Sequence, residues 1–182
     1  KVLTTLEDGP AIPDGAGGCG VYKTMAEAGA AAAKAQRLYL GCSMMDRARF
    51  IQTIRDTVLA QDVLEYMAKS AVEETGMGNY EDKLAKNKLA ATKSPGIEDL
   101  TTDAMGGDDG LTIVEYSPFG VIGAITPTTN PTETIICNSI GMLASGNAVV
   151  FSPHPRAKKL SLWLIQLLNK NLRKAGAPEY LI

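Results

Sequence analysis

The sequence predicts an α/β fold in which N-terminal helices precede the first βαβα half of a doubly wound, Rossmann-like sheet. Two short, almost continuous apolar runs, at residues 121–126 and 148–152, are typical of parallel strands buried on both faces. Helical periodicity follows each run, at residues 132–145 and 156–175. The segment at residues 24–92 carries helical patterns alone, so the helices come first and the sheet second.

Four helices are expected before the sheet. They cover approximately residues 25–40, 47–59, 63–74 and 81–92. Thr24 is a suitable N-cap for the alanine-rich first helix, and Ser43 begins the capping-box-like run Ser-Met-Met-Asp before the second. The third helix should end at Gly76 or Gly78, and the fourth should stop before Pro95, because proline disfavours helical backbone in the residue before it.

One further strand is expected outside the parallel unit. Residues 111–118 have high β-propensity and follow a polar segment, residues 99–110, that is rich in glycine and aspartate. Pro118 cannot donate a ladder hydrogen bond, so this strand should lie at an edge or form an arm.

The two helices of the parallel unit should pack differently. Residues 132–145 are apolar almost all round, which indicates a deeply buried helix. The last helix has one leucine-rich face, with Arg173 and Lys174 at the negative end of its dipole. Gly176 fits its C-cap.

Composition excludes several classes of protein. A formal net charge of −2 gives no electrostatic basis for binding nucleic acid or an anionic membrane. No run of about 18 or more apolar residues is present, so no membrane-spanning helix is expected. Three cysteines without paired spacing favour a reducing, cytoplasmic compartment over a disulfide framework. The methionines are typical of core filler, so no metal site is expected.

Residues 1–20 are expected to be a flexible tail or linker. They are rich in glycine, proline and aspartate and lack the pattern of a secretory signal. Residues 15–20 match the dinucleotide pattern G-x-G-x-x-G, but no strand precedes them, so a linker is favoured over a phosphate loop. Because the chain begins with lysine and stops where another strand should start, we expect it to be a fragment.

Two proline-containing turns follow the predicted parallel strands, at residues 126–131 and 152–155. In open α/β sheets, ligands bind beyond the carboxyl ends of the strands. Proline fixes the backbone angle φ, so these turns should present their remaining amides and carbonyls in a preset arrangement. We expect the two turns to form a single rim.

Asn130 is the informative residue of the first turn. Its side-chain amide could donate a hydrogen bond to a developing oxyanion in a site with little water. The alternative is a turn residue that satisfies its own backbone, and composition alone favours that alternative.

None of the three cysteines is expected to be a nucleophile. Cys137 lies in the helix expected to be buried, where burial would raise its thiol pKa. Cys42 precedes a helix start, a position that can lower a thiol pKa, and Cys19 lies in the linker.

His154, the single histidine, is more consistent with a binding wall than with a general base. The basic run at residues 156–159 could attract a phosphate or simply form a solvated helix face.

Several motifs together resemble the aldehyde dehydrogenase superfamily, in particular its CoA-acylating branch from propanediol- and ethanolamine-utilisation systems. The quoted segments are GVIGAITPTTNPTETIICNSIGMLASGNAVVFSPHPRAKK, AVEETGMG, DKLAKN, PGIEDL and GDDGLTIVEYSPFGV. The resemblance covers roughly residues 20–182. Ordinary members carry a Trp-Asn turn at the first site and a lysine at the second, and this chain has neither.

The resemblance implies the family's chemistry, NAD-dependent oxidation of an aldehyde through a cysteine thioester that CoA takes up as acyl-CoA. It implies that Asn130 is the oxyanion-hole donor. It further implies a nicotinamide-ribose contact by Ile125, Thr126, Pro127 and Thr128, and an adenosine pocket formed by Ser152, His154 and Pro155. Ser152 stands where the family usually has a lysine. This smaller, uncharged side chain would bind the ribose less tightly and leave room for CoA.

The resemblance also implies a division of the chain. The parts are a tail at residues 1–20, the helical part of the cofactor-binding domain at 21–110, an oligomerisation-arm strand at 111–118 and the first half of the NAD-binding sheet at 119–182. The catalytic domain with its cysteine would be absent, so the chain alone should be inactive. The aldehyde should be short, propionaldehyde or acetaldehyde, and the complete enzyme a homodimer or homotetramer in the cytoplasm or in a bacterial microcompartment.

Two other functions remain open at this point. A non-acylating aldehyde dehydrogenase would release free acid instead of acyl-CoA. A nucleotide-binding or scaffold module would keep the pocket without any chemistry.

Overall fold

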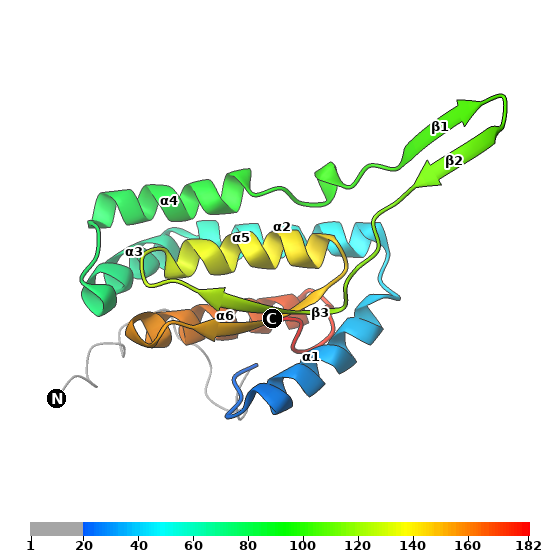
Figure 1. The fold of residues 1–182 in the computed structure, drawn as a ribbon. Helices are drawn as coiled ribbons and strands as arrows, with labels where there is room; N and C mark the ends of the chain where they lie inside the picture. Colours follow the sequence, from blue (N-terminus) through cyan, green and yellow to red (C-terminus); the bar gives the residue numbers. More distant parts are fainter. Residues whose placement is uncertain (1–19) are drawn as a thin grey trace.

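Two parallel strands form the centre of the computed structural model, which describes residues 20–182 (Figure 1). β3 spans Val121–Thr126, β4 spans Ala148–Pro153, and α5, Pro131–Ala144, connects them. A parallel pair needs such a crossover, because a tight turn can join only antiparallel neighbours. The predicted strand–helix–strand order is therefore confirmed.

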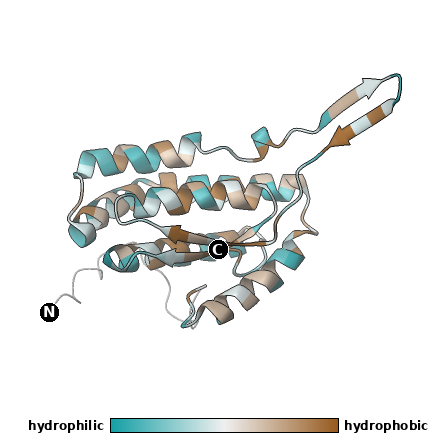
Figure 2. Cartoon of the chain, viewed as in Figure 1, coloured by the Kyte–Doolittle hydropathy of each residue, from teal (hydrophilic) through white to brown (hydrophobic). Residues whose placement is uncertain are grey.

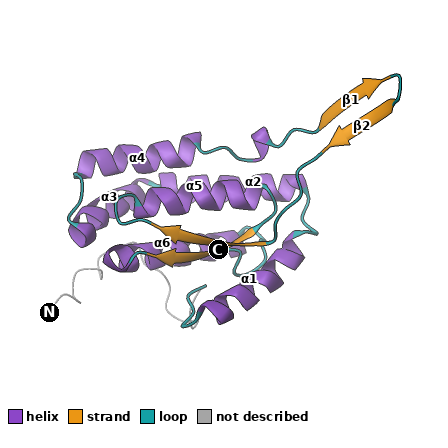
Figure 3. Cartoon of the chain, viewed as in Figure 1, coloured by secondary structure: helices purple, strands orange, loops and turns teal. Residues whose placement is uncertain are grey.

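Helices pack around this pair. α1, Met25–Tyr39, contacts both strands, and α5 contacts both from the opposite side in Figure 1. α6, Lys158–Lys174, follows a short 3-10 helix, Pro155–Ala157, and packs beside α5. Figure 3 shows these helices surrounding the strands. The layers are those of an α/β fold, as predicted.

Three more helices complete the core on the side of α5. They are α2, Met44–Leu59, α3, Gln61–Thr75, and α4, Tyr80–Lys93, and a 3-10 turn, Ile97–Asp99, follows them. The predicted caps are confirmed, since Thr24 and Ser43 each form a capping box. Gly76 ends α3 in the left-handed conformation that glycine adopts without cost, with φ +68°.

A β-hairpin projects from the body of the molecule (Figure 1). β1, Asp103–Gly107, pairs antiparallel with β2, Gly110–Val114, and every residue in both strands is exposed. The arm strand was predicted at residues 111–118, and it ends earlier, at Val114. Its partner β1 lies in the polar segment at residues 99–110, where no strand was predicted. Glycine and aspartate have low β-propensity, so only the pairing across the two-residue turn reveals β1.

Burial of the parallel unit is less complete than the sequence indicates. β4 has the expected covered start, since Ala148 and Val149 are fully buried. In β3, however, Val121 is 37% exposed and Ile125 87% exposed among the described residues. The prediction that both strands are covered on both faces is therefore wrong for β3, because an apolar run cannot report which neighbours are present.

A glutamate from another helix caps the N-terminus of α6. The backbone amides of Lys159 and Leu160 donate to the two carboxylate oxygens of Glu74 at 2.8 and 2.9 Å. The residue in the N-cap position, Ala157, makes no side-chain capping bond. The carboxylate of α3 therefore satisfies the exposed amides and the positive end of the α6 dipole.

Replacing Glu74 by alanine should lower the free energy of unfolding by about 1–2 kcal/mol, because the amides at the start of α6 lose their acceptor. Urea unfolding followed by circular dichroism would measure the change. Glu73→Ala, an exposed neighbour on the same helix, is the matched control and should have little effect. Equal destabilisation by both variants would contradict the capping role.

Candidate functional site

The carboxyl ends of β3 and β4 meet at one edge of the sheet. The register places Ile125 opposite Ser152 and Thr126 opposite Pro153. The two turns predicted to form the site therefore begin side by side. This juxtaposition follows from the parallel pairing and requires no contact between the turns themselves.

The residues at the end of β3 differ strongly in exposure. Ile125 presents an apolar side chain that is 87% exposed, beside the exposed Ser152. Thr126 is 1% exposed, and its hydroxyl has no hydrogen-bond partner among residues 20–182. Pro127 is exposed and Thr128 half-buried. A buried hydroxyl without a partner is unusual in a folded protein and indicates an incomplete environment at this edge.

Asn130 occupies the N-cap position of α5 but does not cap the helix with its side chain. Its backbone carbonyl accepts the amide of Thr134 at 3.1 Å and the Thr134 hydroxyl at 2.7 Å. Pro131 follows and has no amide to satisfy. The carboxamide oxygen is buried without a partner among the described residues. The side chain is therefore not used by its own turn.

A cleft of about 680 Å³ lies beside Asn130, between α4 and α5. One wall is a single stripe of α5, because Asn130, Thr134, Cys137 and Asn138 recur at helical spacing. The opposite wall comes from α4 and the residues after it: Lys86, Leu89, Ala90, Lys93, Ser94 and Pro95. Asn130 thus stands at the start of α5, at one end of this stripe.

Cys137 faces this cleft and is exposed, so the prediction of a buried thiol is wrong. The Ser94 hydroxyl donates to its sulfur at 3.0 Å. The buried face of α5 is made by Ile135, Ile136 and Ile140 instead. The helix is apolar in composition, but only one of its faces is buried. Cys137 lies on the other face and is therefore exposed.

A buried ion pair lies beside the Asn130 turn, and no motif in the sequence predicted it. Lys83 of α4 is 2% exposed, and its ammonium lies 3.4 Å from a carboxylate oxygen of Glu133. The same ammonium donates to the backbone carbonyl of Thr129. The spacing of residues in the sequence could have indicated this burial. Lys83 lies one turn before Asn87 and two turns before Ala90, and all three are on the buried face of α4.

A second cavity, of about 500 Å³, lies beside β4 and contains Ser152. Residues of α1 and α6 complete it, including Met25, Ala28 and Lys158. Asn130 is not among its lining residues, so the expected single rim is divided between two cavities.

His154 and Pro155 lie at the exposed corner after β4. The imidazole Nδ1 accepts the backbone amide of Arg156 at 3.2 Å, so His154 caps the short 3-10 helix. Neither residue lines the cavity that contains Ser152. The histidine is thus engaged in the local turn, and its role as a wall of a nucleotide pocket stays a prediction.

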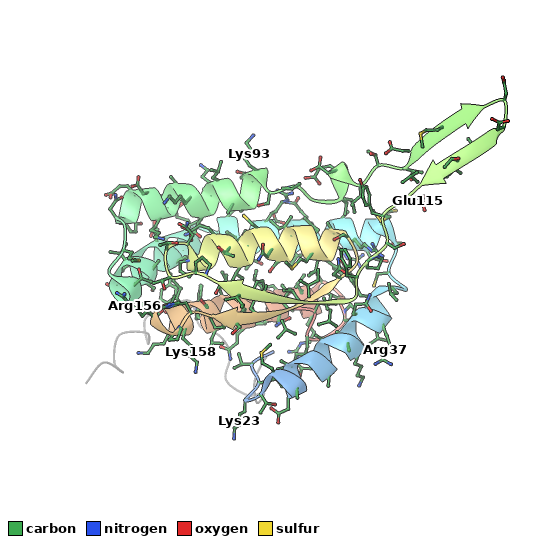
Figure 4. All side chains as sticks on the ribbon, in the orientation of Figure 1. Lys23, Arg37, Lys93, Glu115, Arg156 and Lys158 are labelled. Carbon is green, nitrogen blue, oxygen red and sulfur yellow. The ribbon has the colours of Figure 1, made fainter. Side chains whose placement is uncertain are left out.

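The basic residues near this corner have unequal roles. The guanidinium of Arg156 donates to the carbonyl of Thr75 at 3.2 Å and ties the corner to α3. The α6 amides are already occupied by Glu74. Lys158 lines the Ser152 cavity, and Figure 4 shows Lys158 and Arg156 together near the start of α6. If the basic run attracts a phosphate, it must do so through the charge of its side chains, because the amides at the N-terminus of α6 are already bound to Glu74.

Burial, and secondly the negative charge of Asp46, raise the pKa of the Cys42 thiol, whereas its place before a helix start could have lowered it. Cys19 and the glycine-rich run before Gly20 lie outside the described residues.

Within residues 20–182 no group of three or more metal-ligating side chains occurs, and none of the helices there could cross a membrane.

Comparison with known proteins matches residues 20–182 to the aldehyde dehydrogenase family. The propanal dehydrogenase (CoA-propanoylating) of Salmonella typhimurium strain LT2 is 49% identical over 168 residues, which cover 92% of this chain and 35% of that protein. The chain therefore spans about a third of the length of this relative.

Two solved structures share the fold and much of the sequence. Rhodopseudomonas palustris propionaldehyde dehydrogenase with bound propionyl-CoA is 70% identical, with a TM-score of 0.88, over 90% of this chain and 36% of that one. A propionaldehyde dehydrogenase from the Clostridium phytofermentans fucose utilisation bacterial microcompartment is 52% identical, with a TM-score of 0.85, over 89% and 37%.

The βαβ unit, the turns that end its two strands and the match over residues 20–182 agree with one another. This chain belongs to the aldehyde dehydrogenase family.

Proposed function

We propose that this chain is part of a CoA-acylating aldehyde dehydrogenase that uses NAD to convert propionaldehyde or acetaldehyde and CoA to acyl-CoA. One structural observation carries the catalytic part of the proposal: the Asn130 carboxamide lies beside a cleft and makes no hydrogen bond with its own turn. The acylating class is supported by similarity to a relative named propanal dehydrogenase (CoA-propanoylating) and to a propionaldehyde dehydrogenase with bound propionyl-CoA.

The edge formed by β3 and β4 suits an adenine nucleotide that carries a flat ring and hydroxyl groups. Ile125 offers exposed apolar surface, and Ser152 is small and uncharged. The Thr126 hydroxyl has no partner among residues 20–182. The residues that hold the cofactor in this proposal are Ile125, Thr126, Pro127, Thr128, Ser152, His154 and Pro155. Without a lysine in place of Ser152, the adenosine pocket has room for CoA after the nicotinamide cofactor leaves.

In this proposal Asn130 donates from its side-chain NH2 to the aldehyde oxygen. Negative charge develops on that oxygen when a cysteine thiolate, supplied from outside this chain, adds to the carbonyl carbon. A nicotinamide cofactor held at the edge of β3 and β4 would supply the hydride acceptor for the oxidation. The CoA thiolate then forms a new bond to the acyl carbon and releases the cysteine thiolate. A fixed amide is effective here because it needs no reorientation as the charge appears.

The complete gene product should form acyl-CoA from propionaldehyde, CoA and NAD, whereas residues 1–182 alone should show no turnover. Mass spectrometry of the products separates acyl-CoA from propionate, and parallel reactions with NADP identify the preferred nucleotide. Carboxylate as the sole product would indicate a non-acylating enzyme. Nucleotide binding without any product would indicate a binding module.

Replacing Asn130 by alanine in the complete gene product should lower kcat about 10²–10³-fold, with nucleotide affinity unchanged, because one oxyanion donor is lost. Steady-state kinetics and calorimetric titration with NAD measure the two effects. Asn138→Ala, in the same cleft and two turns further along α5, is the matched control. A kcat for Asn130→Ala close to that of the control would remove Asn130 from the mechanism.

We also propose that the β1–β2 hairpin joins subunits into a homodimer or homotetramer. Its exposed apolar side chains include Met105, Leu111 and Ile113, and Figure 2 shows hydrophobic colour along β2. An isolated two-stranded hairpin is marginally stable in water, so a partner surface would stabilise it. Similarity to a microcompartment enzyme supports the further proposal that the oligomer resides in such a compartment, which co-fractionation with shell proteins would test.

Replacing Leu111 and Ile113 together by aspartate should convert the complete gene product to monomers, because charge would be buried in the interface. Analytical ultracentrifugation reports the assembly state. Leu38→Asp, at an equally exposed leucine on α1, is the control and should leave the oligomer intact. An unchanged oligomer in the hairpin variant would exclude the arm as the contact.

A further inference from the structure

We propose that Lys83, held by Glu133, is a positioning residue that aims the Asn130 carboxamide through the backbone of its turn. This inference rests on the proposed function of Asn130. Lys83 comes from α4, whereas Asn130 and Glu133 belong to the turn and to the first turn of α5. The ion pair thus joins the turn to a helix about fifty residues earlier in the chain.

Burying this ion pair costs free energy, so its presence needs a reason other than stability. The Lys83 side chain is 2% exposed and that of Glu133 is 10% exposed. Burying two charges is less favourable than burying two apolar side chains of similar size, unless the charges make several good hydrogen bonds. Here the ammonium donates to the Thr129 carbonyl, and the Thr132 hydroxyl donates to the Glu133 carboxylate at 3.2 Å.

The contacts fix both peptide units that flank Asn130. Lys83 holds the Thr129 carbonyl, which belongs to the peptide before Asn130. The Thr134 amide and hydroxyl hold the Asn130 carbonyl, which belongs to the peptide after it. With both peptides held, the backbone angles of Asn130 are set at φ −136° and ψ 64°. These angles determine the direction of the bond from the backbone to the side chain.

The side chain of Asn130 has no hydrogen bond of its own within the described residues. Its direction therefore depends on the backbone that carries it. An oxyanion donor must stand close to the position where charge develops, and small displacements of catalytic groups lower rates strongly. Lys83 is thus the residue whose loss would leave Asn130 present but misdirected.

The test uses the complete gene product with Lys83→Met and Glu133→Leu combined. Replacing both ions by apolar residues avoids an unpaired buried charge, and such replacements commonly preserve folding. We expect kcat to fall about 10–100-fold, with KM for the aldehyde and nucleotide affinity nearly unchanged. Lys88→Met, an exposed lysine on the same helix, is the matched control and should retain the parent kcat.

A double-mutant cycle with Asn130→Ala separates positioning from general structural support. If the ion pair acts through Asn130, its removal should cause no further loss of kcat once the carboxamide is gone. A purely structural pair would give the same fold-loss in both backgrounds, which would overturn the inference. Full kcat in the ion-pair variant would overturn it as well.

Crystal structures of the parent and the ion-pair variant give a readout that is independent of activity. We expect the Thr129–Asn130 peptide to rotate and the Asn130 side chain to leave its original orientation. An unchanged turn would overturn the positioning role even if the enzyme were inactive for other reasons. Absence of acyl-CoA formation by the parent, or normal kcat for Asn130→Ala, would instead count against the proposed function.

Discussion

Burial of one face of α5 is the interaction on which the rest of the structure depends. Ile135, Ile136, Ile140 and Leu143 have no exposed surface, and full burial of such side chains contributes about 1.5–3 kcal/mol each. The helix contacts both parallel strands and also α2, α4 and α6. Because its first residue follows the Asn130 turn directly, packing of this face determines where the turn lies relative to the sheet.

Polar contacts then refine the position that packing sets. The apolar face fixes α5 as a rigid body, but it cannot orient the peptides that precede its first turn. The buried ammonium of Lys83 and the hydroxyl of Thr134 supply direction on the two sides of Asn130. Hydrogen bonds have angular preferences that apolar contacts lack, which explains why ions are found in an otherwise apolar layer.

The second strand end is organised differently from the phosphate-binding turn of many doubly wound folds. There, ligand phosphates accept hydrogen bonds from amides at a helix N-terminus. Here the amides at the start of α6 are occupied by Glu74, and His154 caps the turn before them. The surface left for a ligand is the edge of the strands and the Ser152 cavity, with Lys158 as a nearby positive charge.

The sequence alone determined the order of helices and parallel strands, the helix caps at Thr24 and Ser43 and the presence of two proline turns at strand ends, because these depend on local patterns. Tertiary structure decided the rest. The exposure of Cys137, the buried Lys83–Glu133 pair and the division of the rim into two cavities each depend on which distant segment packs alongside. Periodicity identifies an apolar face, but the groups beside a polar residue are set by contacts made far along the chain.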